Sequence, residues 1–319
     1  MRVRLGYVSI ALNLPKTTSS STVTYTRYSK MKTDKEKINK LKEVTKSNLD
    51  GLEKIIRYNI ENEIHFYRIT SNLIPLLTHP EVDFDYKRFF KKDFEYIGNL
   101  IKDNNIRVDT HPDQFNVINS TKKDVVESTL RNLKAQAELF DDLNYPYGKM
   151  VLHVGSSQGG KEESIDRFIN NLKLFPQNIT DKLIIENDDK TFTAKDVLDL
   201  CKRINKPMVL DVHHHICNNE GEEIEELLPE VFKTWENEIL PPKIHFSSPR
   251  EFENDRKHAD YINSSDFIKF LEKAKEVCDI DFDVMIEAKQ KDLALEKLMK
   301  ELKELKPEWN YIDKSTIEI

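Results

Sequence analysis

Six short apolar segments of this chain each end in a histidine, an aspartate or a glutamate. The clearest is residues 207–215, in which Met-Val-Leu is followed by Asp211, a valine and three consecutive histidines. An ionised carboxylate and imidazoles are costly to bury unless a charged partner satisfies them, and a bound metal ion is such a partner. The other five segments end at His111, His153, Glu186, His245 and Glu287.

The spacing of these endings along the chain is regular. It varies between 25 residues, from Glu186 to Asp211, and 42 residues, from His111 to His153. A strand, a helix and two short loops have this length, so the pattern predicts parallel strands joined by helices. Strands are expected at residues 4–10, 65–69, 106–110, 149–154, 182–187, 207–213, 243–247 and 282–287.

Helical periodicity fills the intervals between these strands. A capping box of Thr33 and Glu36 begins the first helix, and Pro241-Pro242 ends the helix before the seventh strand. The remaining helices are expected at residues 84–104, 122–143, 161–174, 193–205, 222–239, 264–277 and 291–305. The alternation predicts an α/β fold, a single TIM-type (β/α)8 barrel over residues 1–319, with no linker that would divide it.

Such a barrel would bring the six ligand-type residues together, because the C-terminal ends of parallel strands meet at one face. A single histidine at such a place is as often a hydrogen-bonded core residue as a ligand. Successive strand ends that carry only His, Asp or Glu are hard to explain by packing, so we predict a metal site at this face. Mixed imidazole and carboxylate ligands favour Zn²⁺ or Mn²⁺ over Mg²⁺ or Ca²⁺, which prefer oxygen throughout.

The composition suits a soluble enzyme. Charged residues make up 33% of the chain, and no apolar run approaches the ~20 residues that span a bilayer. Residues 1–6 lack the apolar core of a signal peptide, so we expect a cytoplasmic protein with no membrane partner. Three widely spaced cysteines predict no disulfide framework. The net charge of −7 argues against nonspecific coating of nucleic acid, although clustered cations would make the site itself positive.

Lys243 lies close to one of the expected ligands. It is separated from His245 by one residue of the seventh strand, so the two side chains project from the same side. A lysine ammonium beside metal ions would be repelled. Either Lys243 binds a substrate phosphate or pairs with a neighbouring carboxylate, or CO₂ carbamylates it and it becomes a bridging ligand. The sequence leaves these alternatives open.

Several motifs, taken in order, resemble the UV damage endonuclease family. They are Leu5-Gly6-Tyr7, the segment 67–75, His111-Pro112-Asp113-Gln114, His153-Val154-Gly155, Glu186-Asn187-Asp188, Asp211-Val212-His213-His214-His215 and the segment 243–248. Each motif is short, but their order and spacing are specific. The likeness covers residues from about 3 to 290. A more distant resemblance is to apurinic endonucleases of the endonuclease IV type, which share the barrel and the metal cluster.

The resemblance implies a metal-dependent repair enzyme that nicks DNA immediately 5′ to a UV photoproduct, leaving a 3′-hydroxyl and a 5′-phosphate. It implies two or three divalent ions, with Mn²⁺ expected and Zn²⁺ or Co²⁺ as alternatives. Lys243 matches the family's modified, metal-bridging lysine. The implied ligands are His111, His153 and Glu186 for one ion, Glu186 with Asp211, His245 and Glu287 for a second, and His214 and His258 for a third.

Two of these carried-over ligands have alternatives. The family's D-x-x-H pattern selects His214 after Asp211, whereas strand alternation alone favours His213. His258 is assigned from its place in a loop, and an ordinary surface histidine is the alternative reading of that position.

The resemblance also implies residues that contact the lesion. The family's Gln-Tyr pair, which wedges into the duplex while the damaged dinucleotide turns out, reads Gln114-Phe115 here. Phe115 keeps the stacking plane and loses the hydroxyl. Tyr7 and Asn13 match residues near the flipped bases, with barrel-core packing as the alternative for Tyr7. His79 matches a residue near the phosphate.

Other functions compete with this one. An apurinic endonuclease of the endonuclease IV type would prefer abasic sites. A sugar isomerase of the xylose isomerase type shares the barrel and two metals, but uses mainly carboxylate ligands and has no task for Gln114-Phe115. A non-catalytic damage-binding protein would keep its activity without Glu186. The sequence favours the repair nuclease, with damaged double-stranded DNA as its partner, no obligate protein partner and a monomeric state.

Overall fold

The strands form a closed parallel ring in the computed structural model, which describes residues 1–319. The ring runs in the order β2-β3-β4-β5-β6-β7-β8-β1, and β1 closes it by pairing with β2. This confirms the expected TIM-type barrel. The strands are β1 (Arg2–Val8), β2 (Phe66–Arg68), β3 (Arg107–Thr110), β4 (Lys149–His153), β5 (Leu183–Glu186), β6 (Met208–Asp211), β7 (Lys243–Phe246) and β8 (Phe282–Ile286), with β9 (Asn310–Tyr311) and β10 (Thr316–Glu318) outside the ring.

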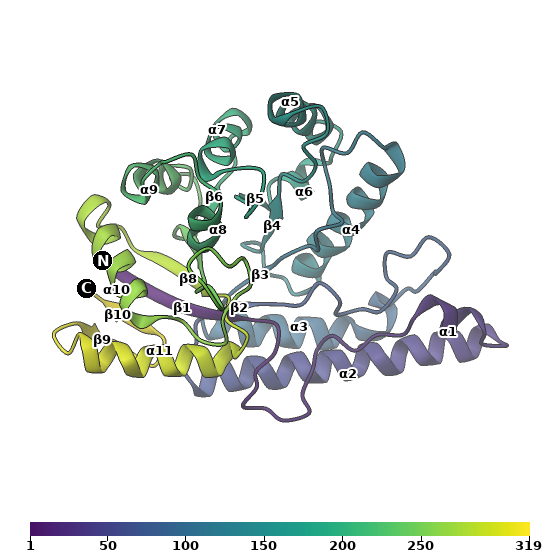
Figure 1. Cartoon of the computed structure of the whole chain (residues 1–319). Coiled ribbons are helices and arrows are strands. Elements are labelled where there is room, and N and C mark those ends of the chain that lie inside the picture. The colour runs from purple at the N-terminus through teal and green to yellow at the C-terminus, as the bar shows by residue number, and fades with distance from the viewer.

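The helices surround this ring, with the long α2 below it and α11 beside α2 in the view of Figure 1. The expected capping box of Thr33 and Glu36 is present at the start of α2. No helix combines the length and the apolarity needed to cross a bilayer. The helices are α1 (Tyr25–Ser29), α2 (Asp34–Glu61), α3 (Lys87–Asp103), α4 (Lys123–Asp142), α5 (Lys161–Leu172), α6 (Gln177–Thr180), α7 (Ala194–Ile204), α8 (Val212–Cys217), α9 (Ile224–Lys233), α10 (Ser264–Val277) and α11 (Lys291–Leu305).

The structure corrects several expected boundaries. The first strand ends at Val8 rather than at residue 10, because Ser9 takes a left-handed conformation with φ of 68°. The sixth strand ends at Asp211, where helix α8 begins, although a strand to residue 213 was predicted. The helix expected at 222–239 is shorter, Ile224–Lys233. Three short helices and the C-terminal strand pair had no counterpart among the predictions: α1, α6, α8, β9 and β10.

One edge of β1 is shared by two strands from opposite ends of the chain. The three-residue strand β2 pairs with the second half of β1, where Gly6 faces Phe66. A Cβ atom on Gly6 would lie 2.4 Å from the carbonyl oxygen of Phe66, so only glycine allows this approach. The antiparallel β10 pairs with the first half, where Arg2 faces Glu318. The edge of β1 that β2 leaves free is therefore covered by β10, which lies beside β1 in Figure 1.

A buried ion network crosses the barrel at the end opposite to the metal site. Asp283 in β8 accepts hydrogen bonds from Arg4 in β1 at 2.6 and 2.7 Å and from Arg107 in β3 at 2.8 Å. The side chains of Asp283 and Arg107 are each 1% exposed. The network joins three strands of the ring, so we assign it to stability rather than to the site at the other face.

Candidate metal centre

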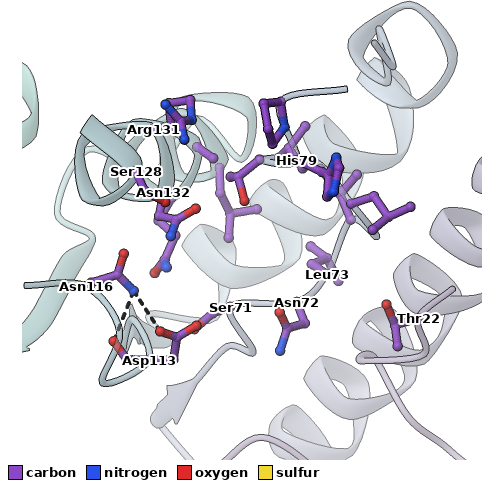
Figure 2. A pocket seen from close by; sticks show the side chains of 18 residues that line it. Thr22, Ser71, Asn72, Leu73, His79, Asp113, Asn116, Ser128, Arg131 and Asn132 are labelled. Atoms are coloured by element: carbon purple, nitrogen blue, oxygen red, sulfur yellow. Dashed lines mark hydrogen bonds between the residues drawn. The ribbon is translucent and has the colours of Figure 1, made fainter. Parts of the chain in front are cut away.

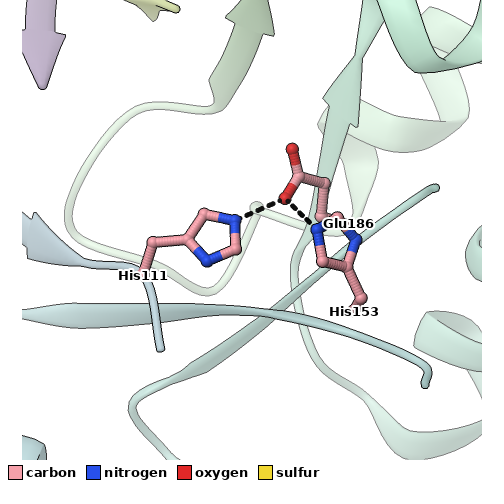
Figure 3. Close-up of side chains that lie close together, drawn as sticks. All are labelled: His111, His153 and Glu186. Atoms are coloured by element: carbon pink, nitrogen blue, oxygen red, sulfur yellow. Dashed lines mark hydrogen bonds and ion pairs between the residues drawn. The ribbon is translucent and has the colours of Figure 1, made fainter. Parts of the chain in front are cut away.

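Three side chains from neighbouring strands meet at the C-terminal face of the barrel. His111 directly follows β3, His153 ends β4 and Glu186 ends β5. The Nε2 atoms of His111 and His153 lie 2.9 and 3.4 Å from the same oxygen, Oε2 of Glu186 (Figure 3). The Glu186 side chain is 1% exposed, so imidazoles rather than water surround its charge. The predicted convergence of strand ends is therefore present.

The second carboxylate oxygen of Glu186 faces the other half of the barrel. Nδ1 of His245, from β7, lies 2.6 Å from Oε1 of Glu186 and 3.3 Å from Oε1 of Glu287, which follows β8. Nδ1 of His214, from α8, lies 3.9 Å from the same Oε1 of Glu186. Glu186 is thus the centre of the cluster, with ligand-type residues on both of its oxygens.

Three groups of donor atoms in this cluster are compact enough to hold a metal ion, and Glu186 belongs to all of them. Within each group the donor atoms lie within 4.8 Å of one another. The first group equals the first ligand set implied by the family resemblance. The implied second set is divided, because Asp211 lies with His214 rather than with His245 and Glu287. The groups are His111–His153–Glu186, Glu186–His245–Glu287 and Glu186–Asp211–His214.

The placement of His214 follows from the way β6 turns into α8. Asp211 is the N-cap of α8, and its Oδ1 accepts a hydrogen bond from the backbone N–H of His214 at 2.8 Å. Successive residues of a helix point about 100° apart, so only one histidine of the three can face the cluster. His214 takes that position, whereas His213 and His215 are buried in other directions. Strand alternation pointed to His213 because it assumed a strand that the structure ends at Asp211.

The donor atoms fit a divalent cation. Oδ2 of Asp211, a residue of one of the three donor groups, is buried and has no hydrogen-bond partner. Buried polar atoms are almost always satisfied, so an unpartnered carboxylate oxygen in this cluster indicates a partner of another kind. Nitrogen and carboxylate oxygen together suit Zn²⁺, Mn²⁺ and similar ions.

The pKa values of the cluster show how tightly its charges interact. Burial, only partly opposed by Glu186, lowers the pKa of His245 to about 4, so this imidazole is neutral at pH 7. Burial raises the pKa of Asp211 to about 7, against the influence of His214. Burial also acts to lower the pKa of His214, but Asp211 and Glu186 outweigh it and raise the value to about 9. A cation that binds here must displace the proton of His214, so binding releases protons.

His258 lies beside the cluster but belongs to none of the three groups. It is brought there by the long loop after β7, which folds back through a bridge between Pro249 and His258. Its Nδ1 lies 3.9 Å from Oε2 of Glu287, and its ring centroid is 6.3 Å from that of His214. His258 thus lies beside Glu287 and the histidines of α8, and its ring is nearer to that of His213, at 5.6 Å between centroids, than to that of His214.

Lys243 is fully buried and pairs with a carboxylate. Its ammonium contacts the side chain of Asp109, which belongs to β3 on the other side of the barrel. Burial lowers the pKa of Lys243 to about 8, although Asp109 acts in the opposite direction. Arg68 of β2 makes an analogous pair with Glu287. Among the alternatives for Lys243, the structure contains the pairing with a neighbouring carboxylate.

Gln114 and Phe115 lie at the tip of the loop that follows His111. A tight turn holds them, because Asp113 accepts hydrogen bonds from the backbone N–H groups of Phe115 at 2.9 Å and of Asn116 at 3.1 Å. The ring of Phe115 is 75% exposed, which makes it the most exposed aromatic side chain of the molecule. A large apolar ring held in water by an ordered turn is typical of a binding surface.

Tyr7 is placed where direct contact with DNA is excluded in this conformation. Its side chain is 0% exposed in the hydrophobic core, and its hydroxyl donates a hydrogen bond to Asn59 at 2.7 Å. The structure thus shows the core packing that was the alternative for Tyr7, and the contact with flipped bases stays a prediction. The reason is that odd-numbered residues of β1 point into the core, as Val3 and Leu5 also do.

Asn13 and His79 lie in loops at the same end of the barrel, outside the donor groups. The side-chain amide of Asn13 donates hydrogen bonds to Glu296 at 2.8 Å and to Tyr58 at 2.9 Å. The ring of His79 stacks on Tyr25, with 3.9 Å between the centroids. The structure therefore places both residues at the mouth but gives neither a contact with the metal cluster.

A cavity of about 440 Å³ adjoins the Gln114–Phe115 turn (Figure 2). His79 lies at one end, and Asp113 and Asn116, which flank Gln114 and Phe115, lie at the other. No sequence pattern indicated this cavity, because its walls come from separate loops and from α4.

Three residues that organise the cluster were not predicted from the sequence. Asp109 pairs with Lys243, and Arg68 pairs with Glu287. The side-chain amide of Asn187 bonds the backbone N–H of Asp211 at 2.8 Å and its carbonyl at 3.0 Å. Arg68 and Asn187 belong to the motifs quoted above and Asp109 lies two residues before His111, but only the barrel geometry shows which residues they bond.

The fold and the cluster define a class of protein, a TIM barrel with a carboxylate-centred group of metal-ligand side chains at its C-terminal face. Endonuclease IV from Thermus thermophilus shares the fold, with a TM-score of 0.57 at 14% identity over 94% of this chain and 99% of that one. At this identity the likeness concerns the fold alone.

The family follows from the sequence as a whole. The family model described as UV-endonuclease UvdE matches residues 3–318, and the chain belongs to this family. A UV DNA damage endonuclease of Bacillus cereus (strain 03BB102) is 40% identical over 308 residues, 96% of each chain. A protein of the same name from Bacillus anthracis is also 40% identical over 308 residues, again 96% of each chain. The crystal structure of SacUVDE matches with a TM-score of 0.85 and 38% identity, covering 95% of this chain and 99% of that one.

Proposed function

We propose that this protein is a metal-dependent DNA repair endonuclease. It hydrolyses the phosphodiester immediately 5′ to UV photoproducts, pyrimidine dimers and 6-4 photoproducts, and leaves a 3′-hydroxyl and a 5′-phosphate. The observation that carries this proposal is the Glu186-centred cluster, which lies at the same barrel face as the exposed Phe115 ring. The relatives named UV DNA damage endonuclease support the choice of substrate.

The proposed ligands are the residues of the three donor groups. We propose two or three divalent ions, with Mn²⁺ expected, and His258 as a further ligand beside His214. When bound, such ions neutralise the phosphate, lower the pKa of a water and stabilise the leaving oxygen. The residues that would hold them are His111, His153, Glu186, Asp211, His214, His245, His258 and Glu287.

The chain's own contribution is to hold these donors in place. Glu186 sets the spacing of the cluster through both carboxylate oxygens. Arg68 fixes Glu287, and the amide of Asn187 fixes the backbone of Asp211 from both sides. Such supporting contacts orient ligands and strongly affect metal affinity. His79, at the mouth, is proposed to contact the phosphate of the substrate.

Lys243 is proposed to belong to the catalytic machinery in one of two forms. As an unmodified amine it balances the charge of Asp109 beneath the cluster. As a carbamate, formed when its nitrogen bonds to the carbon of CO₂ and a proton leaves, it would bridge ions instead. The intact mass of the metal-loaded protein distinguishes the two forms, because only the carbamate adds the mass of one CO₂.

Gln114 and Phe115 are proposed to enter the duplex at the lesion, with Asn13 among the further contacts of the displaced bases. The exposed ring of Phe115 offers a flat surface on which a base can stack. It has no hydroxyl, so insertion relies on stacking and shape rather than on a hydrogen bond from the ring.

Replacement of Phe115 by alanine should lower the affinity for DNA that carries a photoproduct by about 10-fold, because stacking of one base on an aromatic ring contributes roughly 1–3 kcal/mol. Phe115→Tyr should bind like the unchanged protein. Fluorescence anisotropy with a lesion-containing duplex measures both. Tyr147→Ala, at the far end of the barrel and 41% exposed, is the matched control. Equal affinity of the alanine variant and the unchanged protein would contradict the proposed insertion of Phe115 into the duplex.

The proposed reaction is tested with supercoiled plasmid. Nicking of UV-irradiated plasmid, no nicking of unirradiated plasmid and loss of activity with a chelator are expected. Oligonucleotides with one photoproduct or one abasic site decide between this activity and that of an apurinic endonuclease. Aldose–ketose conversion without nicking would support a sugar isomerase instead.

The remaining proposals concern the assembly. We propose that residues 1–319 form one catalytic domain, in keeping with the pairing of β10 with β1 across the whole length of the chain. We also propose that the protein acts as a monomer in the cytoplasm, without an obligate protein partner. Light scattering of the purified protein, free and bound to DNA, tests the monomer.

A further inference from the structure

A small cavity on the outside of the barrel lies between the end of α2 and α11 (Figure 1). It measures about 350 Å³, a size typical of sites for small molecules. Part of its wall is apolar and consists of Ile64, Leu295 and Met299, which are 2%, 1% and 4% exposed. These side chains belong to the hydrophobic core, so a ligand that contacts them needs an apolar part.

Three lysines line the same cavity, and none of them has a carboxylate partner. They are Lys300 and Lys303 of α11 and Lys314, which lies between β9 and β10. Lys297 and Lys306, on either side of the first two, do pair with carboxylates of the protein. Ammonium groups gathered at one cavity repel one another, and a bound anion would remove this repulsion.

Glu296 is the one acidic side chain of the lining, and its carboxylate already has partners. Its Oε1 accepts hydrogen bonds from the side-chain amide of Asn13 at 2.8 Å and from the hydroxyl of Tyr58 at 2.9 Å. The eight residues of the lining thus carry three positive charges and one negative charge. The cavity suits a ligand with an apolar body and more than one negative charge.

Few kinds of ligand combine these properties. Inorganic phosphate has no apolar part, and a single carboxylate brings too little charge for three ammonium groups. A protein partner would need an interface of about 20–30 residues a side, far more than the eight that line this cavity. A nucleoside di- or triphosphate has a flat base with apolar faces and several phosphate charges, and lysine is a usual partner of phosphate.

We propose that this cavity binds a nucleoside polyphosphate, with the base on the apolar wall and the phosphates on Lys300, Lys303 and Lys314. Phosphates beside Glu296 repel its carboxylate and so weaken its hold on Asn13. This consequence rests on the proposed function, which gives Asn13 a contact with displaced bases. The ligand therefore lowers the affinity of the enzyme for damaged DNA, and damaged DNA lowers the affinity for the ligand.

The site itself is tested by calorimetry with the full-length, metal-loaded protein and three probes. ADP should bind with a Kd of about 0.1 mM or below, whereas adenosine and pyrophosphate should bind at least about 10-fold more weakly, because each lacks one half of the contacts. A double variant, Lys300→Gln with Lys303→Gln, removes two of the three ammonium groups and should raise the Kd for ADP at least about 10-fold.

The flanking lysines provide a control with the same change of net charge. Lys297→Gln with Lys306→Gln should leave the Kd for ADP unchanged, because neither residue lines the cavity. Any binding of ADP to the metal centre is equal in both double variants and cancels in their comparison. Melting temperatures show that both variants are folded.

The effect on the reaction is measured separately. Saturating ADP, at a constant concentration of free Mn²⁺, should raise KM for a photoproduct duplex about 5-fold with kcat unchanged. Lys300→Gln with Lys303→Gln should abolish this response, and the flanking double variant should keep it.

The outcomes separate the inference from the proposed function. Equal affinity of the two double variants for ADP overturns the site, and pyrophosphate that binds as tightly as ADP overturns the nucleoside part. An unchanged KM in saturating ADP overturns the link through Glu296. If the protein binds ADP as expected but nicks no photoproduct duplex, the proposed function fails while the site stands.

Discussion

Replacement of Glu186 by glutamine should abolish nicking of irradiated DNA. Glu186 belongs to all three donor groups, and the amide keeps its shape but removes the negative charge that two imidazoles and a divalent ion would share. A fall in kcat by about three orders of magnitude or more is expected, the scale on which loss of a group that stabilises transition-state charge slows an enzyme. Plasmid nicking measures activity, and elemental analysis of the dialysed protein should show less bound metal.

A surface carboxylate provides the matched control for this change. The Glu163 side chain of α5 is 68% exposed and pairs with Arg167, so Glu163→Gln should leave both metal content and nicking unchanged. If Glu186→Gln kept normal activity, the cluster would not be the catalytic centre. If it kept normal metal content but lost activity, Glu186 would act in another role than as the shared ligand.

Replacement of Asp283 by alanine should strongly destabilise the fold without touching the metal site. The change leaves the guanidinium groups of Arg4 and Arg107 without their carboxylate, and the Arg107 side chain is 1% exposed. Removal of one partner from a buried ion network costs about 3–5 kcal/mol, because the remaining charge stays buried. The free energy of unfolding, measured in urea, should fall by this amount.

The location of Asp283 gives this prediction a second observable. Because the network contains none of the residues of the three donor groups, folded Asp283→Ala protein should keep its metal content at low temperature. Asp199→Ala, an exposed position on α7, should change the free energy of unfolding by less than about 0.5 kcal/mol. A normal urea midpoint for Asp283→Ala would show that the network contributes little to stability.

The architecture could be predicted because its signal is periodic. Six of the parallel strands are short apolar runs that end at or next to a charged or imidazole side chain, which packing in a core does not explain. The strands that end at His153 and Glu186 were predicted to within one residue of their observed ends. The C-terminal pair β9 and β10 was missed, since strands of two and three residues are too short to show alternation.

The sequence predicted which residues belong to the site better than it predicted how those residues are arranged. Convergence of His111, His153 and Glu186 follows from barrel topology alone. The placement of His214 depends on the side chain of Asp211, which accepts a hydrogen bond from the backbone of His214 and so begins a helix. Local hydrogen bonds of this kind compete with strand structure, and no periodic pattern of the sequence indicates them. Pairs such as Lys243 with Asp109 join residues far apart in the chain, so no sequence pattern marks them.

The pairing of β1 with strands from late in the chain has a consequence for folding during synthesis. Residues 2–4 pair with residues 316–318 along one edge, and residues 3–6 pair with residues 282–285 along the other. At a synthesis rate of about 5–20 residues per second, the first strand waits roughly 15–60 seconds on the ribosome before its last partners emerge. During that interval its edges are open to other strands. The first half of β1 therefore gains its β10 partner only after more than 300 further residues have been made.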